Sequence, residues 1–484
     1  MLDLLKAEAN QTYTENGALT YATSGSACLD LFASAGALRG AGTEDIAWLV
    51  RRAFAEDRTL TLRIVFYARD VREGLGERRF FRTAIQTLAW EAPEAVKRNL
   101  SYIPEMGRYD DLLCLWDTPC EQAMLEVIAD QLRVDRAAHQ NGQPVSLLAK
   151  WLPSVNASSP VTVQQGKRLA RALGLTQRAY RKLLAALRAD IDILEDHLRR
   201  EDYTFAYAKQ PGQAMLKYRQ AFIRHDGERY SDYLEQVQQG KATLKTGTLY
   251  PYEVIRPCLG EISAAERQAL ETTWQALPDY TNGENALVVA DGSGSMYCWN
   301  NAQPALIALS LAIYFAQRNN GPFHDHFITF SMRAKLVEIK GADIYEQVRC
   351  CAGYNEAANT DLQAVFELIL RTACRHQLPQ EELPQTLYII SDMEFDSCAA
   401  NAGMTNFELA RERYAQAGYR LPKVVFWNVA AHQAQQPVRQ NEQGAILVSG
   451  CSPKVFEMAL SGETTPYHYM MSVLGAERYA AISA

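Results

Sequence analysis

The sequence predicts two parts of different fold class. Residues 1–275 are expected to form an all-α region of HEAT-like helical repeats, and residues 280–484 an α/β, Rossmann-like domain with a mostly parallel sheet. The chain has 484 residues, more than one hydrophobic core normally holds. Up to about residue 275, apolar residues recur at the three- and four-residue spacing of amphipathic helices. After Tyr280, short apolar runs alternate with helix-like stretches, as in buried parallel strands covered by helices.

The helical part contains clear examples of this spacing. They include YRKLLAALRADIDILEDHL at 180–198 and YSDYLEQVQQG at 230–240, where Gly240 ends the helix. Breaks that contain proline, such as WLPSVNASSP at 151–160, separate the helices. Stacked helix pairs are therefore expected, although no fixed repeat period is visible.

The C-terminal part is predicted to hold five buried strands. They are ALVVAD at 286–291, FITFS at 327–331, TLYIISD at 386–392, KVVFWNVA at 423–430 and AILVSG at 445–450. Helices are expected at 302–318, 360–374 and 405–418. Ligands of such sheets bind at the carboxyl ends of the strands, which is where polar side chains are of most interest.

The composition is that of a soluble protein, with 48% hydrophobic and 22% charged residues. Ten cysteines without a CxxC pair favour reduced thiols and a cytoplasmic location. The longest apolar stretch, PALIALSLAIYFA, is too short to cross a bilayer, so no membrane association is expected. A net charge of −7 argues against general nucleic-acid binding, but it leaves room for a local basic surface.

The motif DGSGS follows the first predicted strand of the sheet. Its two glycines allow the oxygens of Asp291, Ser293 and Ser295 to converge on one point. A carboxylate with two hydroxyls is an oxygen-only set of donors, which suits Mg²⁺ or Mn²⁺. Further donors are expected from neighbouring strand ends: Thr360 precedes a helix, and Asp392 ends the strand TLYIISD.

These five residues, in this order and spacing, resemble the metal-ion-dependent adhesion site of a von Willebrand factor A domain. The resemblance implies that Ser293, Ser295 and Thr360 ligate the metal directly, while Asp291 and Asp392 act largely through bound waters. It also implies an open coordination position that a partner's carboxylate can fill. The alternative is a simple Gly/Ser turn with Asp392 as a helix cap, which does not explain why all these residues lie at strand ends.

No catalytic set accompanies these residues in the sequence. Ser293 and Ser295 lack a recognisable activating base, and no phosphate-binding GxxxxGK[ST] loop occurs. The protein is therefore expected to bind a partner rather than to be an enzyme, and a metal-dependent hydrolase is the least favoured interpretation.

Two stretches of the helical part are rich in arginine. The first, residues 67–82, contains Arg69, Arg72, Arg78, Arg79 and Arg82. The second, residues 166–188, has no acidic residue and contains Lys167, Arg168, Arg171, Arg178, Arg181, Lys182 and Arg188. Arginine beside aromatic residues suits phosphate and base contacts to RNA. The alternative is a solvated helix face with the aromatic residues packed in the core.

Three further segments carry a second resemblance: GRYDDLL at 107–113, AKWLPS at 149–154, and residues 214–242. They resemble a family of uncharacterised proteins in which helical repeats precede a von Willebrand A domain. That architecture is similar to the Ro autoantigen, whose TROVE module is a ring of helical repeats closed by such a domain. Ro proteins bind small non-coding RNAs and the ends of misfolded RNAs, although the pI of about 5.8 departs from that pattern.

Two hypotheses about function lead. The first is a Ro-like ribonucleoprotein scaffold, in which the metal-bearing domain closes a helical ring that binds small or single-stranded RNA. The second is a protein-interaction adaptor, in which the Mg²⁺ face binds an acidic residue of a partner and no RNA is involved. The two can coexist, because they use different halves of the chain.

Overall fold

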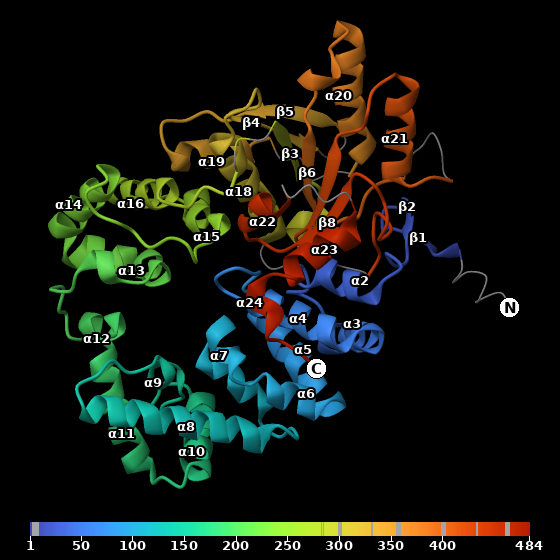
Figure 1. Cartoon of the computed structure of the whole chain (residues 1–484). Coiled ribbons are helices and arrows are strands. Elements are labelled where there is room, and N and C mark those ends of the chain that lie inside the picture. Colours follow the sequence, from blue (N-terminus) through green and yellow to red (C-terminus); the bar gives the residue numbers. More distant parts are fainter. Residues whose placement is uncertain are drawn as a thin grey trace.

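The computed structural model describes residues 1, 9–281, 283, 285–298, 303–330, 333–354, 360–397, 403–431, 434–459 and 465–484. The chain forms a helical part and a sheet domain with helices around it (Figure 1). This agrees with the predicted division into a helical region followed by an α/β region with mostly parallel strands.

The helical part begins with a feature that the sequence did not predict, a short antiparallel hairpin of β1 (Gln11–Tyr13) and β2 (Leu19–Tyr21). The helices that follow are α2 (Ala27–Ser34), α3 (Thr43–Glu56), α4 (Arg58–Arg69), α5 (Arg78–Glu91), α6 (Pro93–Arg98), α7 (Tyr102–Met106), η1 (Tyr109–Leu115), α8 (Glu121–Gln140), α9 (Leu148–Trp151), α10 (Pro160–Ala172), α11 (Gln177–Ile191), α12 (Leu194–Arg199), η2 (Tyr207–Lys209), α13 (Gly212–His225), α14 (Gly227–Gln238), α15 (Pro251–Ile255), η3 (Arg256–Leu259) and α16 (Ala264–Gln275).

Glycine and threonine residues set several helix boundaries in this part. Gly174 has a φ of 68°, which ends α10 in the left-handed region that favours glycine. The Thr176 hydroxyl accepts a hydrogen bond from the Ala179 N–H and so caps α11. Gly240, with a φ of 70°, lies just after α14 as expected.

The second part is built on a six-stranded sheet in the order β5-β4-β3-β6-β7-β8. Its strands are β3 (Ala286–Asp291), β4 (His326–Phe330), β5 (Ala334–Glu338), β6 (Thr386–Ser391), β7 (Lys423–Asn428) and β8 (Ala445–Ser449). All five predicted strands are present and parallel. The edge strand β5, which the sequence did not predict, pairs with β4 in the antiparallel direction.

Helices accompany this sheet, as the two-sided apolar pattern of the strands requires. They are α17 (Ser295–Cys298), α18 (Gln303–Arg318), α19 (Ile344–Ala352), α20 (Leu362–His376), η4 (Gln380–Glu382), α21 (Asn406–Gln416), α22 (Lys454–Ala459), α23 (Pro466–Leu474) and α24 (Glu477–Ala480). The predicted buried helix is α18, in which Pro304–Ala316 are all buried. None of the helices in the described residues has the length and apolarity that crossing a membrane requires.

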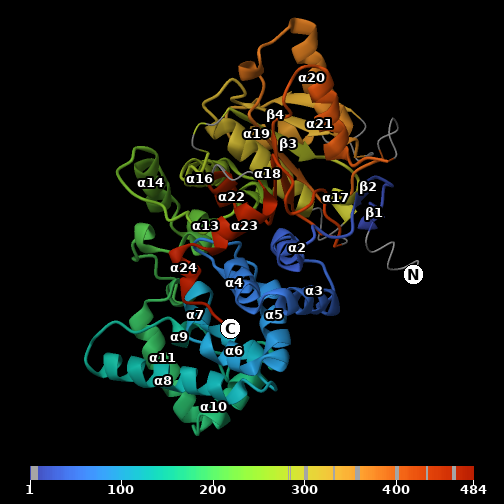
Figure 2. The same cartoon turned by 45° about the vertical axis from the view of Figure 1, so that its right-hand side comes forward.

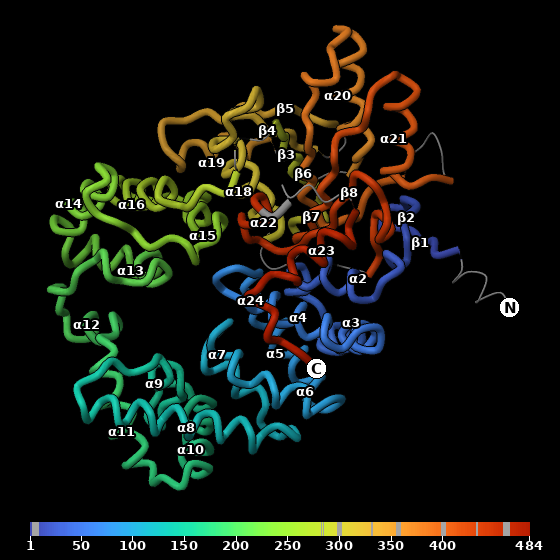
Figure 3. The backbone as a smooth tube through the Cα atoms, in the orientation of Figure 1, coloured from blue at the N-terminus to red at the C-terminus, as the bar shows by residue number. Residues whose placement is uncertain are grey.

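The helical part follows an arc whose two ends both meet the sheet domain. It runs from α2 down through α8–α11 and returns through α12–α16, a path that both views and the tube trace follow (Figures 1–3). At one end α2 packs against β8, and at the other α15 packs against α18 and α16 against α19. The sheet domain therefore connects the ends of the arc, and one hydrophobic core extends through both parts.

The ends of the chain cross between the two parts. The β1–β2 hairpin lies against the sheet domain, while α24 packs on α4 of the helical part. Arg478 of α24 forms an ion pair with Asp70, whose side chain is fully buried. The two parts are thus joined by both termini as well as by the arc.

Candidate functional site

The candidate site lies where β3 and β6 end side by side. Val289 and Ala290 of β3 pair in parallel register with Ile389 and Ile390 of β6, which places Asp291 beside Ser391. The Ser391 hydroxyl donates a hydrogen bond of 2.5 Å to Oδ2 of Asp291. Asp392 follows at the same edge, and both aspartates are 2% exposed. The two predicted carboxylates are therefore brought to one edge of the sheet.

The serines of DGSGS lie directly above this edge. The Ser293 N–H donates to Oδ1 of Asp291 at 2.8 Å, so the loop turns back onto the strand end from which it starts. The hydroxyl oxygens of Ser293 and Ser295 are 3.1 Å apart. Asp291, Ser293 and Ser295 thus form one cluster of oxygen atoms, as predicted for a loop with glycines at the intervening positions.

Thr360 is tied to the same edge from another segment. It is buried just before α20, where its N–H donates to Oδ2 of Asp396 at 3.0 Å. In return the Asp396 N–H donates to the Thr360 carbonyl at 2.9 Å. Because Asp396 comes four residues after Asp392, this pair of hydrogen bonds holds the threonine loop against the chain that leaves β6.

The electrostatics of the edge favour a bound cation. Burial, together with the charge of Asp392, raises the pKa of Asp291 to about 7. Burial also raises the pKa of the Glu394 and Asp396 carboxyl groups. Among the described residues, no lysine or arginine forms an ion pair with Asp291. The ionised carboxylates of Asp291 and Asp392, both buried at one sheet edge, repel each other. A divalent cation bound by both would offset this repulsion and the cost of burying the charges.

The donor set fits Mg²⁺ or Mn²⁺. It consists of two carboxylates and three hydroxyl groups, from Asp291, Asp392, Ser293, Ser295 and Thr360, and these hard oxygen donors suit such ions. The described residues contain no group of three or more His, Cys, Asp or Glu side chains that could hold a metal, so a site of the zinc type is not seen there. A cation at this edge would depend on the serine and threonine hydroxyls.

Several residues of the site were not predicted from the sequence. Ser391 positions the Asp291 carboxylate. Glu394 is 1% exposed and accepts hydrogen bonds of 3.0 Å from the Gln435 side chain. Asn16 of the N-terminal hairpin reaches Thr360 and Glu394. Ser391 and Glu394 flank Asp392 in the sequence and could have been found from that position, whereas nothing in the sequence connects Asn16 to this edge.

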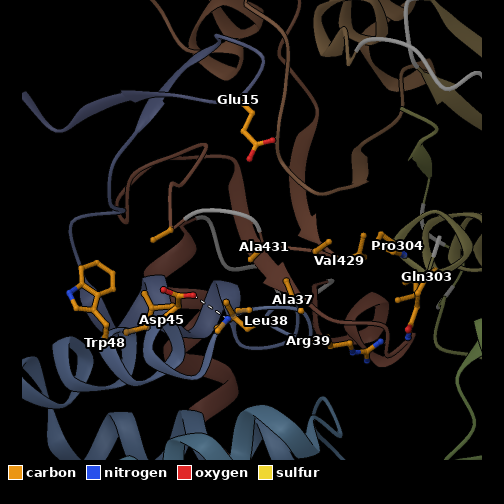
Figure 4. A pocket seen from close by; sticks show the side chains of 17 residues that line it. Glu15, Ala37, Leu38, Arg39, Asp45, Trp48, Gln303, Pro304, Val429 and Ala431 are labelled. Carbon is orange, nitrogen blue, oxygen red and sulfur yellow. Dashed lines mark hydrogen bonds between the residues drawn. The ribbon is translucent and has the colours of Figure 1, made fainter. Parts of the chain in front are cut away.

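A cavity of about 560 Å³ is lined by residues of the hairpin tip, the helical part and the sheet domain. Figure 4 shows Glu15 of the hairpin pointing into it, with Asp45 and Trp48 of α3 at another side. Pro304 at the start of α18 and Val429 after β7 also line the cavity. Glu15 of the hairpin tip therefore lines this cavity, whereas none of the five oxygen donors does.

The first arginine stretch is used mostly for internal contacts. The prediction that Arg69 binds RNA is wrong, because Arg69 is 2% exposed and forms an ion pair of 2.7 Å with the fully buried Asp111. Arg82 also pairs with Asp111, at 2.7 Å, and Arg78 pairs with Asp110 at 2.9 Å. These aspartates belong to the segment GRYDDLL.

The other two residues of this stretch differ from each other. Arg79 is exposed, but its guanidinium donates to the carbonyls of Leu38, Arg39 and Ala41. Arg72 is exposed, and its guanidinium has no ion pair with a carboxylate of the described residues. The dense charge of residues 67–82 is therefore largely neutralised, and only Arg72 keeps a side chain available to a ligand.

The second stretch is more open. Lys167 and Arg171 lie on one face of α10, and Arg178, Arg181 and Lys182 lie on one face of α11; all five are exposed. None of them has an ion pair with a carboxylate in the described part of the chain. Arg168 differs, because it pairs with Asp117 at 2.7 Å and lies 4.0 Å above the Trp116 ring. Arg188 is bound to the Ala149 and Leu152 carbonyls.

The chain is similar to two domains of unknown function, to an uncharacterised viral protein and to a Ro protein of known structure. Residues 285–473 match the model of a domain of unknown function, DUF7788, and residues 14–109 and 158–282 match another, DUF2828. An uncharacterised protein of Acanthamoeba polyphaga mimivirus, L728, is 29% identical over 96% of this chain and 87% of its own length. The crystal structure of the Deinococcus radiodurans Ro (RSR) protein covers 94% of this chain and 100% of its own, with 15% identity and a TM-score of 0.49.

Proposed function

We propose that this protein is a divalent-cation-dependent binding scaffold. The sheet domain would hold Mg²⁺ or Mn²⁺ at the carboxyl ends of β3 and β6, as in the von Willebrand A adhesion site that its sequence resembles. The bound ion would supply a Lewis-acidic position for an oxygen ligand, such as the carboxylate of a protein partner. The helical arc, with both ends on the sheet domain, would support that site.

One observation supports this proposal above the others. Asp291, Ser293 and Ser295 form a single oxygen cluster, Asp392 follows β6 at the same sheet edge, and the Thr360 loop is hydrogen-bonded to the chain just after it. The cluster includes no histidine or cysteine and, within the described residues, no ion-paired cation at Asp291. This arrangement suits ligation of a hard cation better than nucleophilic catalysis, since neither serine hydroxyl has a histidine partner in the described residues.

The proposal can be tested by measuring the affinity for Mn²⁺ with isothermal titration calorimetry. Asp291→Ala should abolish Mn²⁺ binding, because it removes a carboxylate from the cluster. Glu381→Ala is the matched control: it also removes a carboxylate of the sheet domain, but from an exposed position at the amino end of β6. Equal Mn²⁺ affinity of the wild type and Asp291→Ala would exclude the metal site.

A partner experiment completes this test. A protein held through the metal should be captured by the wild type in Mg²⁺, and it should be lost both in chelator and with Asp291→Ala. Capture that persists in both conditions would mean that the partner binds elsewhere on the scaffold.

RNA binding is a second candidate function, and the exposed faces of α10 and α11 favour it. Five exposed cations, Lys167, Arg171, Arg178, Arg181 and Lys182, lie on these two helices and form no ion pair with a carboxylate of the described residues. Figures 1 and 2 place α10 and α11 at the end of the molecule away from the sheet. Single-stranded RNA bound there would be held through its phosphates, so its affinity would fall steeply with salt.

Charge reversal separates this candidate from the first. The triple variant Arg178→Glu, Arg181→Glu, Lys182→Glu should weaken binding of a single-stranded RNA at low salt and lower the salt dependence, while Mn²⁺ binding stays unchanged. Lys241→Glu, at an exposed lysine beyond α14, is the control. RNA affinity that is absent at low salt, or insensitive to the triple reversal, rules this candidate out.

A further inference from the structure

The β1–β2 hairpin has a tip whose shape follows from its sequence. Its turn is Thr14-Glu15-Asn16-Gly17, with the Gly17 N–H bound to the Thr14 carbonyl at 3.0 Å and the Thr14 N–H bound to the Ala18 carbonyl at 2.9 Å. Gly17 has a φ of 82°, the left-handed conformation that closes a three-residue hairpin loop. Glu15 and Asn16 therefore project from the tip.

The base of the hairpin is fixed to the sheet domain. The backbones of Tyr21 and Gln436 exchange hydrogen bonds of 3.1 and 2.9 Å. The Tyr21 hydroxyl donates to Oε1 of Glu408 in α21 at 2.6 Å. These contacts set the position of the hairpin independently of its tip.

The tip meets the candidate metal site on one side. The Thr14 hydroxyl donates to the Phe395 carbonyl at 2.6 Å, and the Glu15 N–H donates to the buried Glu394 carboxylate at 2.7 Å. Nδ2 of Asn16 lies 2.6 Å from the Glu394 carbonyl oxygen and 3.5 Å from Oγ1 of Thr360. Glu15 instead directs its carboxylate into the neighbouring cavity (Figure 4).

Asn16 thus spans the two segments on which the site depends. One is the threonine loop before α20, and the other is the chain that leaves β6 just after Asp392. Groups that orient metal ligands contribute strongly to affinity, because a site whose ligands are already in place loses less entropy when the ion binds. An amide that bridges the two segments restricts how far they can separate.

We infer that the hairpin tip is a structural part of the metal site, with Asn16 as a positioning residue that orients Thr360 and the chain after Asp392. The inference rests on the proposed metal site and extends it to the N-terminal segment of the chain. The metal site is then assembled from the N-terminal hairpin and from segments of the sheet domain between Asp291 and Asp396.

The test is Mn²⁺ binding by the full-length protein, measured by calorimetry and by the electron paramagnetic resonance spectrum of the bound ion. Asn16→Ala should raise the Kd for Mn²⁺ about tenfold, the usual effect of losing a group that orients a metal ligand. Asn16→Ala should also change the electron paramagnetic resonance spectrum of the bound Mn²⁺, because the ligands around the ion are then held less firmly. Gln11→Ala, which removes an exposed polar side chain from the same hairpin, should leave both unchanged.

A second variant shows whether Asn16 acts through Thr360. Thr360→Val should itself weaken Mn²⁺ binding, and adding Asn16→Ala to it should then have little further effect, since the effects of coupled residues are not additive. Fully additive effects would overturn the assigned role.

The outcomes separate this inference from the proposed function. If Asn16→Ala binds Mn²⁺ like the wild type while Asp291→Ala does not bind, the metal site stands and the role of Asn16 is rejected. If Asp291→Ala also binds like the wild type, the metal site is rejected and the inference is rejected with it. Thermal unfolding in chelator checks that Asn16→Ala and Gln11→Ala are equally folded.

Discussion

Individual residues of this chain divide into those that hold the fold and those left for a ligand, and charge alone does not tell them apart. Arg69 and Arg178 both belong to arginine-rich stretches. Arg69 is buried against Asp111, while Arg178 is exposed without a carboxylate partner among the described residues. The difference arises because GRYDDLL carries two aspartates into the first stretch, whereas among the described residues the acidic pair that reaches α10, Asp117 and Glu121, binds Arg168 and leaves the other cations of α10 and α11 unpaired.

Removal of the buried arginine should destabilise the protein. Arg69→Met removes one of the two arginines that lie 2.7 Å from the buried Asp111 carboxylate, and the free energy of unfolding should fall by about 3 kcal/mol. Arg72→Met, at an exposed position three residues later, should change it by less than about 0.5 kcal/mol. Urea unfolding of the two variants compares them directly, and equal losses would contradict the structural role of Arg69.

A histidine of α12, His197, should make stability depend on pH. The ring N–H groups of His197 donate hydrogen bonds to the Asp192 and Asp202 carboxylates, at 2.7 and 2.8 Å, and these bonds raise the pKa of His197. A pKa raised by folding contributes stability below the unfolded value of about 6.5, and this contribution is lost as pH rises through the folded pKa.

The pH effect can be isolated by substitution. Between about pH 6 and about pH 8.5, the midpoint of thermal unfolding should fall more in the wild type than in His197→Gln, because only the wild type loses a charged imidazole. An equal fall in both proteins would show that other groups cause the pH dependence.

At the scale of elements, the register of β3 against β6 decides which side chains share the edge of the sheet. Parallel pairing of Ala290 with Ile390 places Ser391 opposite Asp291, although the two residues are a hundred positions apart in the chain. Each strand was predictable from its apolar run, but the pairing between them was not, because any parallel order of these strands would bury them equally well.

Ser391 should therefore be needed for metal binding. Ser391→Ala removes the hydroxyl that donates to Asp291, and the Kd for Mn²⁺ should rise about tenfold. Thr386→Val, a buried position at the other end of the same strand, is the control and should not alter the Kd. If both variants bind Mn²⁺ equally well, Ser391 does not orient the cluster.

The hairpin illustrates a second limit at this scale. β1 and β2 have three residues each, too few for a periodic signal, and the segment was expected to belong to a helical region. Their position depends on contacts with residues near 395 and 436, which only tertiary packing brings together. The same contacts turn Asn16 into a candidate residue of the metal site.

At the scale of the whole molecule, the helical arc and the sheet domain are packed as one body. Gly36, just after α2, lies very close to the backbone that follows β8. A Cβ added to Gly36 would lie 2.5 Å from the backbone nitrogen of Gly450. A real Cβ cannot approach backbone so closely, so the contact between α2 and β8 requires glycine at this position.

Gly36→Ala should separate or strain this contact. Overpacking of this kind lowers the free energy of unfolding by about 1–3 kcal/mol, and it should increase proteolytic cleavage between the arc and the sheet domain. Gly227→Ala, at a helical position where an added Cβ meets nothing within 4 Å, is the matched control and should be tolerated. Equal stability of the two variants would mean that the contact is loose in solution.

The sequence by itself determined the local structure and the chemistry of the candidate site. It predicted the helical and α/β parts, the five parallel strands, and the oxygen donors Asp291, Ser293, Ser295, Thr360 and Asp392, because apolar period and strand-end residues are properties of short segments. Only the tertiary structure decided how those segments meet. It placed Ser391, Glu394 and Asn16 around the donors, buried Arg69 and left α10 and α11 open, because burial and pairing depend on residues that are distant in the chain.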